Sequence, residues 1–368
     1  MGNFKLIACQ NFVCFTMWQV NSAESVHFLY LHKPFIMSSI NRRSFIAKTS
    51  LGASAALGLP ALPSLASPQQ DPWQCVHNTN TMQTIISLTG LPAPVTVLQI
   101  ADTHISCDNE SDREYEQYSA RMNRAFLERK HYKTGEPTTT MACFKEMMEM
   151  AKQENVDLIA LVGDIVNYPS ATAVEFVRSA VEVAGIPHIY TAGNHDWHYE
   201  GMKGSSDELR KEWCEKRLKP LYTGSNLFYS SDIVGGINMV TIDNSTYQVN
   251  EEQLTFFRDQ LKKAEPVALF VHIPLHMQSM RMCCGHPQWG AASDKNNEIE
   301  RRERWSASGN QASTVAFVKE VMAAKKLTGI FAGHWHQYYS ISQRQVNQHL
   351  ALPGFNGQYR MIRFQPLV

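Results

Sequence analysis

The sequence lacks an excess of charge of either sign. Lys and Arg together number 34, as do Asp and Glu, so the formal net charge is zero. This balance gives no support to a nucleic-acid partner or an anionic membrane surface. The sequence also lacks the bias of disordered, collagenous or coiled-coil chains, because 44% of its residues are apolar and 18% are charged. A globular protein is therefore expected.

Cysteine is scarce, with eight residues in a chain of 368. None of them forms a Cys-x-x-Cys pair, so the common pattern of a structural zinc site is missing. Six cysteines follow residue 66, and the sequence does not choose among their fifteen complete pairings. A disulfide-rich module fits poorly because these cysteines are scattered.

The N-terminal region has no apolar run long enough to span a bilayer. Its short apolar stretch, residues 49–62, follows Arg42-Arg43 and precedes the small residues Ser64-Leu65-Ala66. This order is typical of a signal peptide, and the paired arginines resemble a twin-arginine signal. We expect residues 1–66 to be an N-terminal extension with this signal, with Met37 as the true start. A short amphipathic anchor is the alternative. The signal predicts a periplasmic or extracellular protein exported by the twin-arginine machinery.

The rest of the chain alternates short β-branched runs with helical periodicity, which indicates an α/β fold. Residues 67–94 are interpreted as a linker leading into an edge strand, and residues 95–368 as one domain. Insertions near 106–139 and 277–309 are either surface loops or walls of a substrate pocket. Strands are predicted at 95–100, 156–162, 186–191, 237–242, 267–271 and 327–332, with short late strands at 338–342, 349–352 and 359–364. Helices are predicted at 112–131, 140–154, 171–184, 207–219, 251–263 and 311–325.

Five of the predicted strands run into side chains that can bind metal ions. These side chains form Asp102-x-His104, Gly163-Asp164, Gly193-Asn194-His195-Asp196, the single His272 and Gly333-His334-x-His336. Asp-x-His, Gly-Asp and the single His are weak signals alone, whereas Gly-Asn-His-Asp is a sharper one. Ligands of open α/β sheets bind beyond the carboxyl ends of the strands, so we expect the five segments to meet at one place.

This ordered set resembles the calcineurin-like metallophosphoesterase superfamily over about residues 95–343. The resemblance implies a four-layer αββα sandwich of two mixed β-sheets flanked by helices, with two metal ions at the carboxyl ends of the strands. It also implies that His195 faces the scissile phosphate, with Asp196 as its partner. By the same match, Asp164 bridges the two ions, the first ion is held by Asp102, His104 and His336, and the second is held by Asn194, His272 and His334.

The residue types suit this chemistry independently of the resemblance. Imidazole binds Zn or Fe well, and carboxylates also accept Mn, so we expect two divalent or mixed-valence ions of these elements. A pair of close cations can lower the pKa of a shared water and clamp the oxygens of an in-line displacement. His195, if charged, can stabilise the transition state or protonate the leaving oxygen.

The expected function is thus an exported metal-dependent phosphoesterase, which hydrolyses phosphate monoesters or diesters by attack of a bridging hydroxide. Its partner is a small phosphorylated substrate. A non-catalytic metal-dependent binding protein on the same scaffold is the alternative. Within enzymes, a purple-acid-phosphatase-like or a cyclic-nucleotide phosphodiesterase activity stays open. Purple acid phosphatases carry a tyrosine ligand three residues after the bridging aspartate, where this chain has Asn167. The adjacent Tyr168 could take that role only through a bulge.

Overall fold

The computed structural model describes residues 73–126, 129–277, 280 and 310–367. The predicted signal peptide, the start at Met37 and nearly all of the 277–309 insertion lie outside the described residues. Within the described part, no helix is both long and apolar enough to cross a membrane. The four cysteines described there, Cys75, Cys107, Cys143 and Cys214, are all free thiols.

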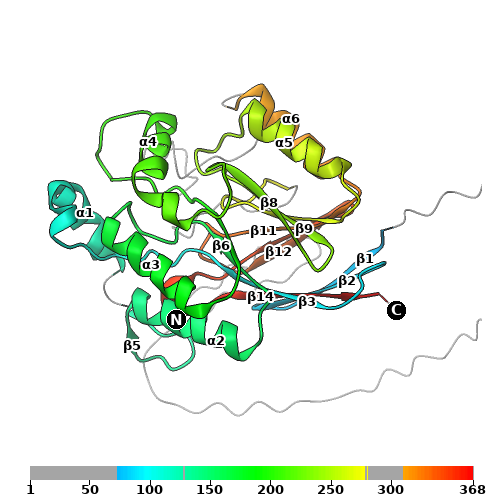
Figure 1. The fold of residues 1–368 in the computed structure, drawn as a ribbon, viewed down its shortest axis with the longest axis horizontal. Helices are drawn as coiled ribbons and strands as arrows, with labels where there is room; N and C mark the ends of the chain where they lie inside the picture. Colours follow the sequence, from blue (N-terminus) through cyan, green and yellow to red (C-terminus); the bar gives the residue numbers. More distant parts are fainter. Residues whose placement is uncertain (1–72, 127–128, 278–279, 281–309, 368) are drawn as a thin grey trace, which may run out of the picture. The chain divides into compact units, whose positions relative to one another are not determined.

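Two six-stranded sheets form the centre of the domain (Figure 1). The first sheet has the order β1 (Cys75–Thr79), β2 (Gln83–Leu88), β14 (Arg360–Pro366), β3 (Val95–Ile100), β6 (Leu158–Val162) and β7 (His188–Thr191). The second has the order β12 (Tyr339–Gln343), β13 (Val346–Leu350), β11 (Leu327–Ala332), β10 (Val267–Phe270), β9 (Ile237–Ile242) and β8 (Tyr229–Val234). Both sheets mix parallel and antiparallel neighbours, as predicted.

The α-helices are α1 (Glu116–Asn123), α2 (Thr140–Gln153), α3 (Ala171–Ala184), α4 (Ser206–Trp213), α5 (Glu251–Lys262) and α6 (Ala312–Ala323). Helix α3 shows why the local sequence predicts its ends. The Ser170 hydroxyl caps the first turn by accepting a hydrogen bond from the Ala173 amide, and Gly185 ends the helix with a left-handed φ of 69°. A short hairpin pairs β4 (Arg129–Lys130) with β5 (Pro137–Thr138).

Three hydrophobic cores hold the layers together. In the first sheet, Leu98 and Ile159 point outward and pack with α2 and α3, while their neighbours Val97 and Leu158 point to the opposite face. That opposite face packs on the second sheet, for example on Phe331. Residues of α5 and α6 cover the outer face of the second sheet. This alternation of buried side chains builds the αββα sandwich that the resemblance implied.

The helix predicted at 112–131 and the linker predicted at 67–94 are among the segments that differ from the structure. Residues 112–131 do not form one helix: a 3-10 turn, Glu110–Tyr115, precedes α1, and another, Arg124–Phe126, follows it. The carboxylate of Asp112 accepts hydrogen bonds from the backbone amides of Ala171 and Thr172, so contacts with the start of α3 replace a continuous helix. Residues 67–94 contain two paired strands, β1 and β2, and only β1 lies at the sheet edge.

Candidate metal centre

The carboxyl ends of β3, β6, β7, β10 and β11 carry the predicted site residues. Strands β3, β6 and β7 are parallel neighbours, as are β10 and β11 in the other sheet. Backbone hydrogen bonds join the loops that follow them: the Asp102 amide donates to the Gly163 carbonyl, and the Gly333 amide donates to the His272 carbonyl. The convergence that the sequence predicts is therefore present in the fold.

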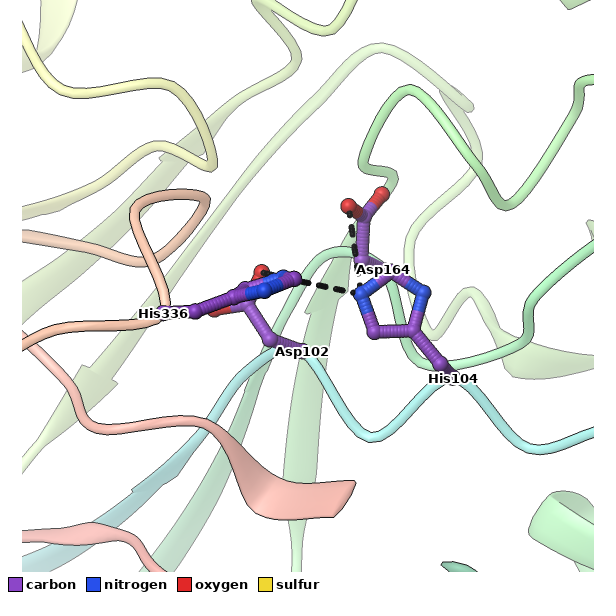
Figure 2. Close-up of side chains that lie close together, drawn as sticks. All are labelled: Asp102, His104, Asp164 and His336. Carbon is purple, nitrogen blue, oxygen red and sulfur yellow. Dashed lines mark hydrogen bonds and ion pairs between the residues drawn. The ribbon is translucent and has the colours of Figure 1, made fainter. Parts of the chain in front are cut away.

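The ligand-type side chains form two groups that share one carboxylate. Asp102, His104, Asp164 and His336 place one ligand atom each within 4.8 Å of one another, and so do Asp164, His272 and His334. Figure 2 shows the first group, with Asp102 and His104 on one loop and Asp164 and His336 on two others. A shared aspartate between two donor sets is the arrangement expected of a two-ion centre.

Distances in the first group suit a single cation. The Nε2 atoms of His104 and His336 are 3.0 Å apart, and His336 Nε2 lies 3.4 Å from Asp102 Oδ1 (Figure 2). His104 Nε2 lies 3.8 Å from Asp164 Oδ2. Without an ion, one imidazole must donate a proton to the other across this contact, whereas with an ion both nitrogens can direct lone pairs at it.

In the second group, His272 Nε2 lies 3.2 Å from Asp164 Oδ2, and its Nδ1 contacts the Val162 carbonyl at 2.9 Å. Asn194 is buried, and its Oδ1 makes no hydrogen bond to any described residue. A buried amide oxygen without a donor is costly, and a cation would satisfy it. The donor set of imidazole, carboxylate and amide oxygen therefore fits a metal ion.

The backbone at the site is held in an uncommon conformation. Eight non-glycine residues in the described part have a positive φ, and five of these are predicted ligands. They are Asp102 (55°), His104 (43°), Asp164 (51°), His334 (72°) and His336 (52°). Left-handed φ values cost a side-chain-bearing residue free energy, and such strain gathers where function needs a fixed geometry. The loops thus preorganise the donor atoms.

The glycines of the motifs make room for the ligands. A Cβ atom on Gly163 would collide with the imidazole of His272, and one on Gly193 would collide with the backbone and carboxylate of Asp164. A Cβ on Gly333 would lie 2.7 Å from Asp102 Oδ2. Each glycine therefore allows a ligand from a different loop to approach closely.

Charge favours cation binding at the shared aspartate. Burial alone would raise the pKa of Asp164, but His272 and His195 outweigh it and hold this pKa well below its ordinary value. Burial lowers the pKa of His104 well below its ordinary value. Burial would lower the pKa of His272, but the negative charge of Asp164 acts in the opposite direction, and this pKa is raised to about 10. A metal ion that binds His272 must therefore displace its proton.

His195 lies beside the first group. Its backbone amide donates to Asp164 Oδ1 at 2.8 Å, and its ring packs edge-on against that of His104, with 4.6 Å between centroids. Its Nδ1 lies 3.1 Å from Asn167 Oδ1 and 3.3 Å from the Asn167 carbonyl. No local pattern in the sequence predicts this contact of Asn167, which lies three residues after Asp164.

The expected pairing of Asp196 with His195 stays a prediction, and the structure gives the Asp196 carboxylate backbone partners. The buried carboxylate of Asp196 accepts hydrogen bonds from the backbone amides of Gly193, at 2.7 Å, and Val166, at 2.8 Å. It therefore ties the loop after β7 to the loop after β6. Asn167 Oδ1 contacts the His195 ring.

The hydroxyl of Tyr168 contacts the 106–139 insertion. Its hydroxyl donates to Asn123 Oδ1 at 2.6 Å and contacts Asp108 Oδ2 at 3.0 Å. Burial raises its pKa far above the ordinary value, so the phenol stays protonated. Neither Tyr168 nor Asn167 thus provides the tyrosinate of a purple acid phosphatase.

The 106–139 insertion borders the first group. The ring of Phe126 stacks on His104, with centroids 4.1 Å apart and planes 9° from parallel. The guanidinium of Arg129 lies 4.7 Å from the Phe126 centroid and 4.8 Å from that of Phe355. Phe355, in turn, lies 5.2 Å from the His336 ring. This part of the insertion is a wall of the site and not a remote surface loop.

Comparison with known proteins gives matches of several kinds. A curated relative from Fibrobacter succinogenes, named a probable cyclic nucleotide phosphodiesterase, is 25% identical over 189 residues, which are 51% of this chain and 60% of that protein. The match therefore covers less than two thirds of the relative. A dimetal phosphatase from Danio rerio is 12% identical, with a TM-score of 0.46, over 73% of this chain and 91% of that one. A purple acid phosphatase from yellow lupin seeds is also 12% identical, with a TM-score of 0.43. The match covers 75% of this chain and 46% of that one.

The family match extends from β3 to the loop after β11, which carries His334 and His336. Residues 95–338 match the family described as Calcineurin-like phosphoesterase. This range is well over half of the chain and includes all five motifs. The chain belongs to the calcineurin-like phosphoesterase family.

Proposed function

We propose that this protein is an exported phosphoesterase that uses two metal ions to hydrolyse small phosphate mono- or diesters. The observation that carries the proposal is the position of Asp164, whose carboxylate belongs to both groups of ligand-type side chains. The first ion would be held with Asp102, His104 and His336. The second would be held with Asn194, His272 and His334. Mn, Fe and Zn suit these donors best.

Two bound ions would supply Lewis-acid charge at the phosphate oxygens and lower the pKa of a shared water. The protein contributes a rigid, buried frame for this charge. Asp102 and Asp164 are fully or almost fully buried, and their loops hold strained φ values. Neutral Asn194 adds an oxygen donor without a further negative charge, which leaves the site positive enough to attract phosphate.

His195 is assigned to the leaving group or to the phosphate oxygens. Its Nδ1 faces the Asn167 carbonyl, an acceptor, so Nδ1 would carry a proton and the assigned role would use Nε2. A protonated Nε2 can donate to the developing charge on the leaving oxygen. Asn167 thereby acts as a positioning residue for this ring.

His195→Ala is expected to keep both ions and lower kcat by about 10²–10⁴-fold, the usual contribution of a general acid. The loss should be larger for an alkyl leaving group than for nitrophenolate, which departs without protonation. Parallel measurements of ion content and of kcat on the two esters check this. Full activity of the variant on the alkyl ester would show that the role assigned to His195 is wrong.

Diesters are the first substrate class to test, because the Fibrobacter relative is named a probable cyclic nucleotide phosphodiesterase. Release of nitrophenol from mono- and bis-nitrophenyl phosphate, with Mn, Zn and Fe supplied in turn, separates the two ester classes. Cyclic nucleotides extend the panel. Absence of ion-dependent turnover on every ester, despite bound ions, would contradict the proposed function and favour a binding protein.

Export is supported by the Arg42-Arg43 pair and the short apolar stretch that follows it. This route carries folded proteins, which suits a domain that acquires its ions before export. Cell fractionation tests the proposal. Mature protein that lacks residues 1–66 should be found outside the cytoplasm, and full-length protein confined to the cytoplasm contradicts it.

A further inference from the structure

Tyr247 is a buried tyrosine that contacts a predicted ligand of the second ion. Only 1% of its surface is exposed, and its hydroxyl lies 3.0 Å from His334 Nε2. The two rings meet edge to face, with centroids 5.9 Å apart and planes at 79°. No motif in the sequence marks this residue, because it lies in the loop between β9 and α5.

The loop holds Tyr247 firmly in place. The Tyr247 amide donates to the Asn244 carbonyl at 2.8 Å, and its own carbonyl accepts from Asn310 Nδ2 at 2.9 Å. Its φ is 60°, a value that glycine or asparagine adopts far more easily than an aromatic residue. Local backbone preference therefore does not explain a tyrosine at this position, whereas the contact with His334 does.

The contact assigns different tasks to the two nitrogens of His334. Nε2 contacts the Tyr247 hydroxyl, and His334 offers one ligand atom to the group that it forms with Asp164 and His272. An ion held in this group would use Nδ1. The backbone amide of His334 is also fixed, because it donates to both oxygens of Asp102, at 3.0 and 2.9 Å. Backbone and ring are thus held from two sides.

We propose that Tyr247 is a positioning residue for the second metal ion, and this inference rests on the proposed function. A neutral imidazole that gives one lone pair to a cation carries its proton on the other nitrogen. The Tyr247 oxygen accepts that proton in a hydrogen bond, which selects the tautomer and the ring orientation of His334. Outer partners of this kind strengthen metal binding by about 10–100-fold.

The test uses Tyr247→Phe in the full chain, with Mn²⁺ binding measured by titration calorimetry. The dissociation constant of the ion held with His334 should rise by about 10–100-fold. The constant of the ion held with His104 and His336 should stay unchanged, a selectivity that general loss of structure would not produce. Tyr199→Phe is the matched control, because Tyr199 is fully buried and its hydroxyl has no hydrogen-bond partner among the described residues.

A second pair of variants shows whether Tyr247 acts through His334. In the His334→Ala background, Tyr247→Phe should have no further effect on Mn²⁺ binding. Tyr247→Asn repeats the measurement with a residue that adopts the positive φ readily, in case phenylalanine impairs folding. Equal constants in Tyr247→Phe and wild type, or an undiminished effect in the His334→Ala background, would overturn the inference. A wild-type chain that binds fewer than two ions would contradict the proposed function itself, and the inference with it.

Discussion

Asp164→Asn is expected to weaken binding of both metal ions and to lower kcat/KM by at least about 10³-fold. Asp164 belongs to both groups of ligand-type side chains, and its neighbours His272 and His195 keep its pKa well below the ordinary value. Asparagine preserves the size and one oxygen but removes the charge that neutralises two close cations. Ion content by elemental analysis, together with kcat/KM on a nitrophenyl ester, measures both effects.

The matched control is Asp157→Asn, at the other end of the same strand. Asp157 precedes β6 as Asp164 follows it, and its Oδ2 accepts a hydrogen bond from the Thr96 amide at 2.7 Å. This control tests whether loss of any carboxylate that is bound to the backbone near β6 lowers ion binding and turnover. The Asp157→Asn protein should retain both ions and full turnover. Comparable losses in the two variants would show that Asp164 acts only through folding.

Gly193→Ala is expected to impair the centre although it adds a single methyl group to a residue that is not a ligand. The new Cβ would overlap the backbone nitrogen and the carboxylate of Asp164. Rotation of a flexible side chain cannot relieve this overlap, because the backbone is part of it. Overpacking of this kind costs about 1–3 kcal/mol of folding free energy. Displacement of Asp164 by even about 1 Å should reduce turnover by about 10²-fold. Denaturant unfolding and kcat measure the two effects.

Gly224→Ala provides the comparison for Gly193→Ala. A Cβ on Gly224 would lie 3.3 Å from the Ser230 Cβ and 3.9 Å from the Asn226 carbonyl, which small adjustments can accommodate. Neither glycine has a positive φ, so the pair differs in available space and not in backbone conformation. A Gly193→Ala protein as active as Gly224→Ala would show that the close approach of the two loops does not matter.

The ligand positions could be predicted because their signals are local. Each lies within four residues of the end of an apolar strand, and parallel strands bring their carboxyl ends to one edge. For the same reason, the predicted ranges agree with the bounds of β3, β9, β11 and α3. The apolar pattern of each element, and the capping residues of the helix, lie within or beside the element itself. Hydrophobic periodicity and turn residues are therefore sufficient to predict the strands that carry the metal ligands.

The contacts around the ligands could not be predicted, because they join loops that are distant in sequence. Asp196 follows His195 in the chain, yet its carboxylate turns to the Val166 amide, while Asn167 contacts the His195 ring. Tyr247 reaches His334 across 87 residues, and no local pattern marks it. The expected helix at 112–131 is wrong for a related reason, since Asp112 accepts hydrogen bonds from backbone amides at the start of α3, which lies far along the sequence.

Elemental analysis of catalytically active protein tests the central claim most directly. The pairing of two donor sets around Asp164 predicts two transition-metal ions per chain, and parallel loss of ions and hydrolysis when a chelator removes them. Full hydrolytic activity in protein that contains no metal would contradict the account.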